Sequence, residues 1–454
     1  VWWSSGSFRG NSRPRSGEEP NPCRTGLRKP VCRRSGPAST TDNPRTVTRW
    51  PDSLRAVPTH VKRTFKYRFY PTDAQAAELS HTFGCVRKAY NLALAARTKA
   101  WILRQQRVNC NATSAMLTEW KKTEELAYLN DVSSVPLQQA LRHLQTAFAD
   151  FFGKRAKCPR FKLRKKSRTS AEYTTSAFRF RDGRLALAKM AEPLDIVRSR
   201  PLPEHAVLST VTVSQDAAGR WFVSLLVEDQ SVQPPAANDR AVGVDVGLDH
   251  LLTLSTGEKI SSPRHGRRDR ARLAKAQREL ARKAKGDGAN RARARGRVAK
   301  VYARIADRRR DNLHKITTRL VRENQAIVIE DLTVRNLLKN GELARAVSDA
   351  AWSEFRSMPA YKAQWYGREV IAVDRWFPSS ELCSTCGSVR NKMPLNVRTW
   401  TCDCGTTHDR DVNAARNILA AGLAVSACGA GVRPQRNSPG GQSATKQEFL
   451  RREP

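Results

Sequence analysis

Alternating apolar and polar residues in the segment KRTFKYRFY (62–70) predict a β-strand that buries one face. A capping-box sequence follows at 72–75, in which a threonine hydroxyl and a glutamine amide satisfy free backbone groups at the start of a helix. Apolar residues then recur at steps of three and four over 79–94, and helical spacing returns in 117–129 and 137–152. The pattern therefore predicts a strand followed by a group of helices.

The pattern changes to short alternating segments between 171 and 230, with turn sequences at Asp182-Gly183 and Ala218-Gly219. Several neighbouring strands are expected there. The proline-containing stretch 233–239 predicts a linker, and 241–262 reads as strands again.

The C-terminal half combines buried strands with helices. QAIVIEDL (325–332) and REVIAVD (368–374) contain short apolar runs typical of strands that are covered on both faces. Segment 264–315 has a helical pattern with 20 basic and five acidic residues, and its break at 286–288 predicts the tip of a helical hairpin. A capped last helix is predicted in HDRDVNAARNILAAGLAV (408–425).

Charge changes this picture most, because 81 Lys and Arg against 42 Asp and Glu give a net charge of +39. A protein this basic is expected to bind a polyanion whose phosphates neutralise its self-repulsion. The 454 residues correspond to about three domains. No apolar run reaches the ~20 residues that span a bilayer, and the first residues lack the pattern of a secretory signal, so no membrane location is expected.

Four of the ten cysteines form two close pairs, Cys383-x2-Cys386 and Cys402-x-Cys404. Two such pairs on tight turns supply four thiolates to tetrahedral zinc, and four protein ligands indicate a structural rather than a catalytic ion. The second pair is one residue shorter than the usual spacing, and unrelated cysteines are the alternative interpretation.

Acidic residues stand on three separate predicted elements. Asp245 lies in the apolar strand GVDVG, where a carboxylate costs several kcal/mol unless it is paired or binds a cation; actin-like ATPases and sugar kinases share this short pattern. Glu330 ends another apolar strand, and its neighbour Asp331 must face the opposite side. Asp409 and Asp411 begin the last helix, where either is equally well a helix cap. Together, acids on a strand, a strand and a helix can converge on two magnesium or manganese ions for phosphodiester hydrolysis.

Two basic segments are candidates for contacts with nucleic-acid phosphates. Segment 154–168 holds nine basic residues among 15 and no acid, and segment 264–315 carries cations on all faces of its predicted helices. A solvated surface is the alternative explanation of any such run. The side chains expected to bind nucleic acid are Lys154, Arg155, Lys157, Arg160, Lys162, Arg164, Lys165, Lys166, Arg308, Arg309 and Arg310.

From about Val61 to its C-terminus the chain resembles the TnpB proteins of bacterial insertion sequences, which are compact relatives of type V CRISPR effector nucleases. The co-linear strings that carry the resemblance include KYRFYPTDAQ, TFGCVRKAYNLAL, GVDVGLDHLLTLSTG, IVIEDLTVRNLLKN, DRWFPSSELCSTCG and WTCDCGTTHDRDVNAARNIL. The resemblance implies a multidomain α+β and α/β protein with a RuvC-like nuclease domain of the RNase H type. It implies that Asp245, Glu330 and Asp411 are the catalytic acids that hold Mg²⁺ or Mn²⁺, with Asp409, Arg410 and Asn413 in support.

The resemblance also implies how the domains are arranged along the chain. The first 60 residues match nothing in the family, and their composition predicts a disordered extension. The implied layout is a wedge β-barrel in 61–72 and 169–237, a helical recognition domain in 73–168, the nuclease domain in 238–382 and 405–424, a zinc ribbon in 383–404, and a flexible tail in 425–454.

The activity implied by the resemblance is RNA-guided cleavage of DNA. A noncoding guide RNA from the transposon end would pair with double-stranded target DNA, while a protein monomer reads a short motif beside the target and grips the heteroduplex by its backbone. Such a protein is expected in the bacterial cytoplasm, associated with the nucleoid. The alternatives are a nuclease-inactive RNA-guided repressor, a transposition accessory protein, and a transposase that joins DNA ends itself.

Overall fold

The structure is a computed structural model that describes residues 48–49, 61–164, 167, 169–204, 206–284, 288–390, 393–394 and 396–427. Its contacts divide the chain into two compact units. Among the described residues, the first unit comprises those in 61–233 and 269–304, and the second comprises 48–49 and those in 234–268 and 305–427. The expected tail from residue 428 on and residues 286 and 287 of the hairpin tip expected at 286–288 lie outside the described residues.

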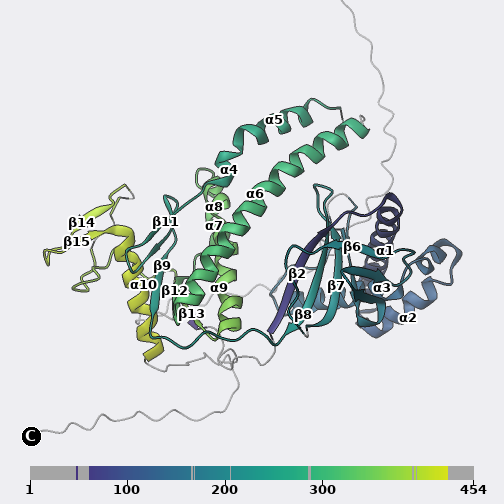
Figure 1. The fold of residues 1–454 in the computed structure, drawn as a ribbon, viewed down its shortest axis with the longest axis horizontal. Coiled ribbons are helices and arrows are strands. Elements are labelled where there is room, and N and C mark those ends of the chain that lie inside the picture. Colours follow the sequence, from purple (N-terminus) through teal and green to yellow (C-terminus); the bar gives the residue numbers. More distant parts are fainter. Residues whose placement is uncertain are drawn as a thin grey trace, which may run out of the picture. The chain divides into compact units, whose positions relative to one another are not determined.

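The first unit is built on a seven-stranded antiparallel sheet in the order β3-β7-β8-β2-β6-β5-β4 (Figure 1). Its two outer strands are joined by the short 3₁₀ helix η3 (Thr175–Ala177), so the sheet is nearly closed on itself. The strands are β2 (Val61–Phe69), β3 (Thr169–Thr174), β4 (Phe178–Arg181), β5 (Arg184–Leu187), β6 (Leu194–Val197), β7 (Val207–Gln215) and β8 (Trp221–Asp229).

Helices in the first unit share one hydrophobic core with this sheet. The predicted capping box is present, because Thr72 and Gln75 exchange side-chain and backbone hydrogen bonds at the start of the first helix. Leu79 and Phe83 of that helix are buried in one cluster with Phe69 of β2. The helices of this core are α1 (Asp73–Arg104), α2 (Cys110–Trp120), the 3₁₀ helix η2 (Glu124–Asn130) and α3 (Ser134–Phe152). The first unit also contains α5 (Arg270–Ala281) and the first part of α6 (Gly288–Glu323), whose residues lie outside that cluster.

The second unit contains a six-stranded sheet in the order β1-β13-β12-β9-β10-β11, in which β9, β12 and β13 are parallel. A separate two-stranded ribbon joins β14 and β15. The strands are β1 (Thr48–Arg49), β9 (Ala241–Asp245), β10 (His250–Leu254), β11 (Lys259–Ser261), β12 (Ala326–Glu330), β13 (Glu369–Val373), β14 (Thr399–Thr401) and β15 (Thr407–Asp409). The helices, besides the end of α6, are α4 (His265–Arg268), α7 (Val334–Leu337), α8 (Ala344–Ala350), α9 (Trp352–Tyr366) and α10 (Arg410–Ala427).

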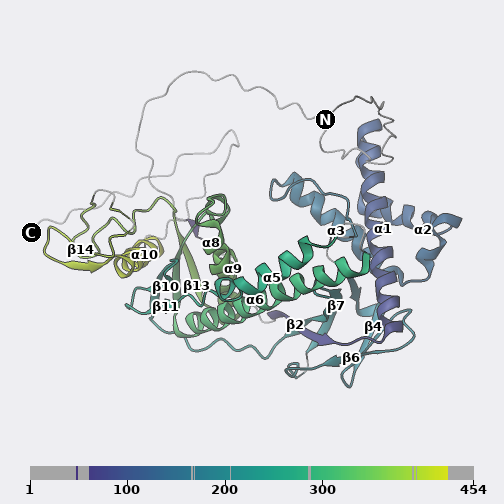
Figure 2. The same cartoon turned by 90° about the horizontal axis from the view of Figure 1, so that it is seen from above.

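Strand alternation decides which helix covers which face of the six-stranded sheet. In β12, Ile327 and Ile329 belong to the buried cluster formed with α6 and α9, whereas Val328 belongs to the cluster that includes Ile418 of α10. Figures 1 and 2 show α10 (yellow) on one side of these strands and α6 and α9 (green) on the other. The sheet is therefore covered on both faces, as its continuous apolar strands predict.

Two glycines allow α10 to lie directly on the strands. A methyl group built on Gly243 in β9 would overlap the carbonyl oxygen of Ala415, and one built on Gly422 in α10 would overlap the side chain of Val328. Residues without a side chain are needed at such a close approach of helix and sheet. This contact fixes the position of the first turn of α10 relative to the ends of β9 and β12.

Some predicted elements differ from the structure. The helical pattern in 117–129 is split, since α2 ends at Trp120 and η2 follows; the buried side chains of Leu126 and Leu129 are three residues apart, which matches the three-residue turn of a 3₁₀ helix. The expectation of a disordered extension fails at Thr48–Arg49, which pairs with β13, and the rest of 1–60 lies outside the described residues.

One boundary between the compact units falls in the predicted linker, after Gln233, whereas Asp269–Arg304 groups with the first unit, so that another boundary falls inside α6, after Arg304. Because α6 continues without a break through this boundary, the helical periodicity of its sequence does not reveal where the boundary lies. None of the described helices combines the length and the apolar composition needed to cross a bilayer.

Candidate active site and cysteine cluster

Asp245 and Glu330 end two neighbouring parallel strands of the second unit. Val244 is aligned with Ile329, so the two acids that follow lie side by side at the same edge of the sheet. Asp245 has the same strand parity as Gly243, which contacts α10, and Glu330 has the same parity as Val328 on that face. Both carboxylates therefore belong to the face that α10 covers.

Asp331 lies on the opposite face, as predicted from alternation. Its carboxylate forms ion pairs with Arg356 of α9 and, at 2.9 Å, with Arg375. Only Glu330 of this acidic pair is available to the site that contains Asp245.

The two acids at the start of α10 have different surroundings. Asp409 caps the helix, because its Oδ1 accepts a hydrogen bond of 3.0 Å from the amide of Val412, and its Oδ2 is 2.6 Å from Lys259 Nζ. Burial raises the pKa of Asp409, but the hydrogen bonds from Lys259 and Val412 outweigh burial and leave that pKa below its ordinary value. Asp411 lies in the first turn of α10, and its charge acts on Asp245.

Like charges gather in a place with little access to water. Burial, the neighbouring charge of Glu330 and the charge of Asp411 raise the pKa of Asp245 to about 8. Burial also raises the pKa of Glu330, although a 2.7 Å hydrogen bond from Ser379 Oγ opposes the shift. Carboxyl groups that are held together against their own repulsion are typical of a functional site, and hard divalent cations prefer such oxygen ligands.

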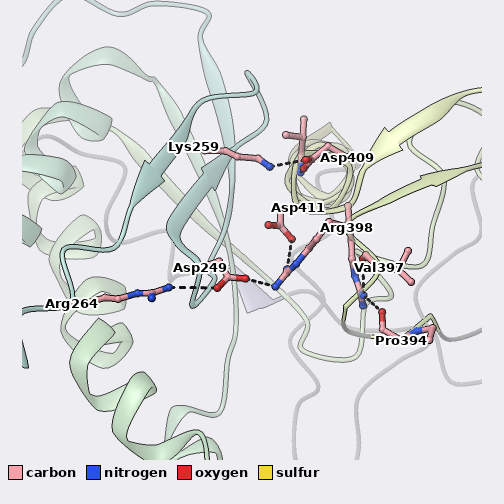
Figure 3. A network of polar contacts seen from close by, with 10 residues as sticks. Asp249, Lys259, Arg264, Pro394, Val397, Arg398, Asp409 and Asp411 are labelled. Atoms are coloured by element: carbon pink, nitrogen blue, oxygen red, sulfur yellow. Dashed lines mark hydrogen bonds and ion pairs between the residues drawn. The ribbon is translucent and has the colours of Figure 1, made fainter. Parts of the chain in front are cut away.

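One arginine forms ion pairs with two aspartates at this site. Arg398 forms an ion pair of 3.6 Å with Asp411 and a second ion pair with Asp249, which is itself 3.5 Å from Arg264 (Figure 3). Arg398 precedes β14, whereas Asp249 precedes β10 on the main sheet. The bridge therefore connects the ribbon segment to the sheet and balances part of the negative charge of the site.

Arg410 and Asn413 form hydrogen bonds with main-chain groups of residues 382–397, the segment that leads into the β14–β15 ribbon. Arg410 Nη1 donates to the carbonyl oxygens of Pro394 at 2.7 Å and Val397 at 3.4 Å. The buried Asn413 accepts from the amide of Ser384 at 2.9 Å and donates to a carbonyl oxygen at 2.7 Å. These contacts give both residues a positioning role between α10 and the ribbon, and their expected place near a reacting phosphate stays a prediction.

The four cysteines form the one group of three or more His, Cys, Asp or Glu ligands that the described residues bring close enough for a shared ion. Their sulfurs all lie within 4.8 Å of one another, with 3.8 Å between Cys383 and Cys404 and 3.6 Å between Cys386 and Cys402. Zn–S bonds of about 2.3 Å in a tetrahedron place sulfurs about 3.8 Å apart, so the donor set and its spacing fit such an ion. The three carboxylates are spread more widely than this cluster.

Each knuckle stabilises one thiolate, Cys386 in the first and Cys404 in the second. The hydrogen bond from the amide of Cys404 lowers the pKa of Cys402, but burial and hydrogen bonds with the neighbouring sulfurs outweigh it and raise that pKa to about 12. Hydrogen bonds from the side chain and amide of Ser388 lower the pKa of Cys386 to about 6, and the matching bonds from Thr406 lower the pKa of Cys404. Gly387 and Gly405 follow with φ of 76° and 83°, in the left-handed region that tight turns require.

The basic candidates fall into two groups. Lys154, Arg155, Lys157, Arg160 and Arg164 have exposed side chains, although Arg155 pairs with an acid of α3 at 2.9 Å; Lys165 and Lys166 lie outside the described residues.

Among the other basic candidates, Lys162, Arg309 and Arg310 contact other side chains of the protein. Lys162 lies 4.0 Å over the ring of Tyr90, and burial lowers its pKa. Arg309 and Arg310 of α6 each pair at 3.0 Å with an acid of the second unit, and Arg308 is exposed. Contact of any of these residues with nucleic acid stays a prediction.

Several residues of the site had no signal in the sequence. Arg398 and Asp249 are separated by 149 positions, and Ser379 and Glu330 by 49. Only the tertiary fold brings these pairs together.

The class of protein follows first from the fold. A chain of the solved structure "Cryo-EM structure of the Cas12f1-sgRNA-target DNA complex" matches this one with a TM-score of 0.50 and 13% sequence identity. The match covers 80% of this chain and 99% of that chain. The chain therefore has a fold similar to that of Cas12f1, a mixed α/β protein.

The family follows from sequence comparison. Three family models match: "Helix-turn-helix domain" at 59–106, "Probable transposase", OrfB of IS605, at 223–341, and "Cas12f1-like, TNB domain" at 352–418. In the structure the first of these segments forms β2 and the single long helix α1.

Full-length relatives agree with the family models. A Streptomyces pristinaespiralis protein named "Putative RNA-guided DNA endonuclease" is 71% identical over 389 residues, which cover 86% of this chain and 96% of the relative. The similarly named InsQ of Escherichia coli K12 is 34% identical over 404 residues, which cover 83% and 97%. The chain belongs to the TnpB family, and the family model that matches its central part is that of OrfB of IS605.

Proposed function

We propose that this protein is an RNA-guided DNA endonuclease of an insertion sequence, and that its second unit is a RuvC-like nuclease domain of the RNase H type. The observation that carries the proposal is the convergence of Asp245, Glu330 and Asp411 on one edge and one face of the sheet. The chain belongs to a family whose members are named as RNA-guided DNA endonucleases, which supports DNA as the substrate.

Asp245, Glu330 and Asp411 would hold the catalytic Mg²⁺ or Mn²⁺. Bound there, divalent metal would activate a water and stabilise the leaving oxygen during phosphodiester hydrolysis. The protein's own part is to hold the carboxylates in register: Ser379 fixes Glu330 by a 2.7 Å hydrogen bond, and the close packing of α10 on β9 fixes Asp411. Arg398 would neutralise part of the charge of Asp411 through their 3.6 Å ion pair.

The first unit would carry the guide and its target. Its nearly closed sheet would be the wedge β-barrel in 61–72 and 169–237, and α1 to α3 would form the helical recognition domain in 73–168. The exposed cations of 154–164 and of α6 are the candidate contacts to the phosphates of RNA and DNA. A noncoding guide RNA from the transposon end, double-stranded target DNA, a monomeric protein and an association with the nucleoid complete the proposal.

The direct test is to sequence the RNA that co-purifies with the protein and then to offer DNA that matches its guide segment. We expect one noncoding RNA species and cleavage of matched DNA beside a short motif, only with Mg²⁺ or Mn²⁺. Unmatched DNA is the control. Target binding without cleavage in any metal would favour the nuclease-inactive repressor instead, and joined transposon ends would favour a transposase.

The cysteine cluster would hold a structural zinc ion that braces the start of α10. We expect about one zinc per chain, and loss of that zinc in the Cys402→Ser variant, because three thiolates with a weaker fourth ligand do not complete the site. Cleavage should fall as well, since Asn413 and Arg410 tie α10 to the ribbon. Zinc content is measured by mass spectrometry of the metal.

The matched control for this substitution is Cys110→Ser, which changes a half-buried cysteine of α2 outside the cluster. It should retain zinc. A full equivalent of zinc in the Cys402→Ser protein would contradict the assignment of the ligands.

A further inference from the structure

A rigid loop beside the carboxylates presents one tryptophan to solvent. The loop follows β13, and Trp376 within it is 80% exposed, the largest fraction among the exposed large apolar side chains of the described residues. Trp352 and Trp400 of the same unit are 7% and 5% exposed. None of the described rings or cations stacks on the Trp376 indole, so its exposure needs another explanation.

The exposure does not come from a loose loop, because the residues around Trp376 are anchored. The amide of Trp376 donates to Asp374 Oδ1 at 2.8 Å, and Arg375 donates to Thr333 and, at 2.9 Å, to Asp331. On the other side, Phe377 packs against the apolar cluster between the sheet and α10. The backbone therefore holds the indole outward at a fixed place.

That place is next to the acids. Ser379 ends the loop, donates its hydroxyl to Glu330 and accepts a 2.8 Å hydrogen bond from Asn417 of α10. Three residues span at most about 11 Å between Cα atoms, so Trp376 lies within that distance of the residue that touches Glu330. Phe377 packs on the α10 face, which is also the face of Asp245 and Glu330.

The chemistry of this position favours one planar, unpaired nucleobase. A protein partner is recognised by a contiguous apolar patch, whereas here a single ring stands among Arg375, Asp374 and the loop backbone. Aromatic side chains beside a positively charged surface are the usual platforms for the bases of single strands, because every base offers a π-face. The chain's charge of +39 supplies the electrostatic attraction for the backbone of such a strand.

We propose that Trp376 is the platform of a nucleobase subsite, on which an unpaired base of the DNA strand entering the carboxylate site stacks. The subsite rests on the proposed nuclease function, and it makes Trp376 a positioning residue for the strand that is cut. It acts on the base, while the carboxylates act on the phosphate.

The first experiment compares single-turnover cleavage by the protein with its co-purified guide RNA, using wild type, Trp376→Ala and Trp376→Phe. Stacking on one base corresponds to a rate or affinity change of about 5- to 150-fold, so Trp376→Ala should slow cleavage by at least about fivefold and Trp376→Phe should keep most of it. Binding of guide RNA and of target DNA should not change. Leu338→Ala, which removes another exposed large apolar side chain of the second unit, is the control and should cleave normally.

The same reaction is then run on targets with a single abasic site, moved one nucleotide at a time around the cut. One abasic position should slow wild type as much as Trp376→Ala does, and that position should have no further effect in the variant. Equal cleavage by wild type and Trp376→Ala, or equal sensitivity of both to every abasic site, would overturn the subsite.

A second measurement does not depend on cleavage. A short single-stranded DNA is added to the Asp245→Ala protein, and the quenching of tryptophan fluorescence is compared with that of the Asp245→Ala/Trp376→Phe protein. Less quenching in the double variant is expected, and no difference overturns the proposal. If the quenching depends on Trp376 but the wild-type protein cleaves no DNA, the subsite stands and the proposed nuclease function is rejected. Quenching lost only in variants of Trp101, another exposed tryptophan, would place the strand elsewhere.

Discussion

Asp245→Ala is expected to lower the single-turnover rate of target cleavage by at least about a thousandfold. The substitution removes a carboxylate that would bind the catalytic metal, and each factor of ten in rate corresponds to about 1.4 kcal/mol of transition-state stabilisation, so the loss is about 4 kcal/mol. Guide RNA and target binding should remain, because Asp245 lies at the end of β9 among acids rather than among cations. Cleavage on gels and binding by mobility shift measure the two quantities separately.

Asp409→Asn is the matched control, because Asp409 belongs to the same motif as Asp411 but has a different structural role. An asparagine oxygen can still accept the hydrogen bond from Val412 that caps α10, while the ion pair with Lys259 is lost. Cleavage should stay within a few-fold of wild type. Unchanged cleavage by Asp245→Ala, or a thousandfold loss in Asp409→Asn, would show that the triad is wrongly assigned.

Strand alternation makes the placement of two of the acids predictable from the sequence. A carboxylate at the end of an apolar strand has only two faces to choose from, and Glu330 and Asp331 take one each. Motif resemblance selected Asp411 over Asp409, and the structure gives a physical reason for the choice in the cap and the ion pair of Asp409. The seven-stranded sheet was foreseen as separate short strands, but its order was not.

Contacts between distant segments account for what could not be predicted. No spacing rule connects Arg398 with Asp249, and none predicts that Asn413 accepts a hydrogen bond from the amide of Ser384. Gly243 reads in the sequence as part of a phosphate-binding pattern, while in the structure its missing side chain lets the backbone of α10 come close. Tertiary packing decides each of these roles, and a linear pattern does not contain it.

The grouped acids should cost the metal-free protein stability, and this cost depends on pH. The pKa of Asp245 is raised to about 8 from an ordinary value of 3.8, so the folded state binds a proton more tightly than the unfolded chain does. This contribution to stability is complete below pH 3.8 and is lost as pH rises toward 8. In a chelator, the melting temperature of wild type should therefore fall between pH 5 and 8 relative to that of Asp245→Asn, which lacks the titrating group.

The same proton competes with the metal, and the dependence of cleavage on Mg²⁺ should reveal it. Below pH 8 Asp245 must release a proton before it can bind a cation, so the Mg²⁺ concentration for half-maximal cleavage should fall about tenfold for each unit between pH 6 and 7.5 and become constant above about pH 8. Between pH 6 and 7.5 the rate at fixed, subsaturating Mg²⁺ should therefore rise by about thirtyfold, while saturating Mg²⁺ shifts the plateau to lower pH. If the half-maximal Mg²⁺ concentration stays the same from pH 6 to 9, no protonated carboxylate competes with Mg²⁺ for the site. That result would count against Asp245 as a metal ligand even if Asp245→Ala were inactive, because the pH dependence tests the contact with metal and the substitution tests only the need for the residue.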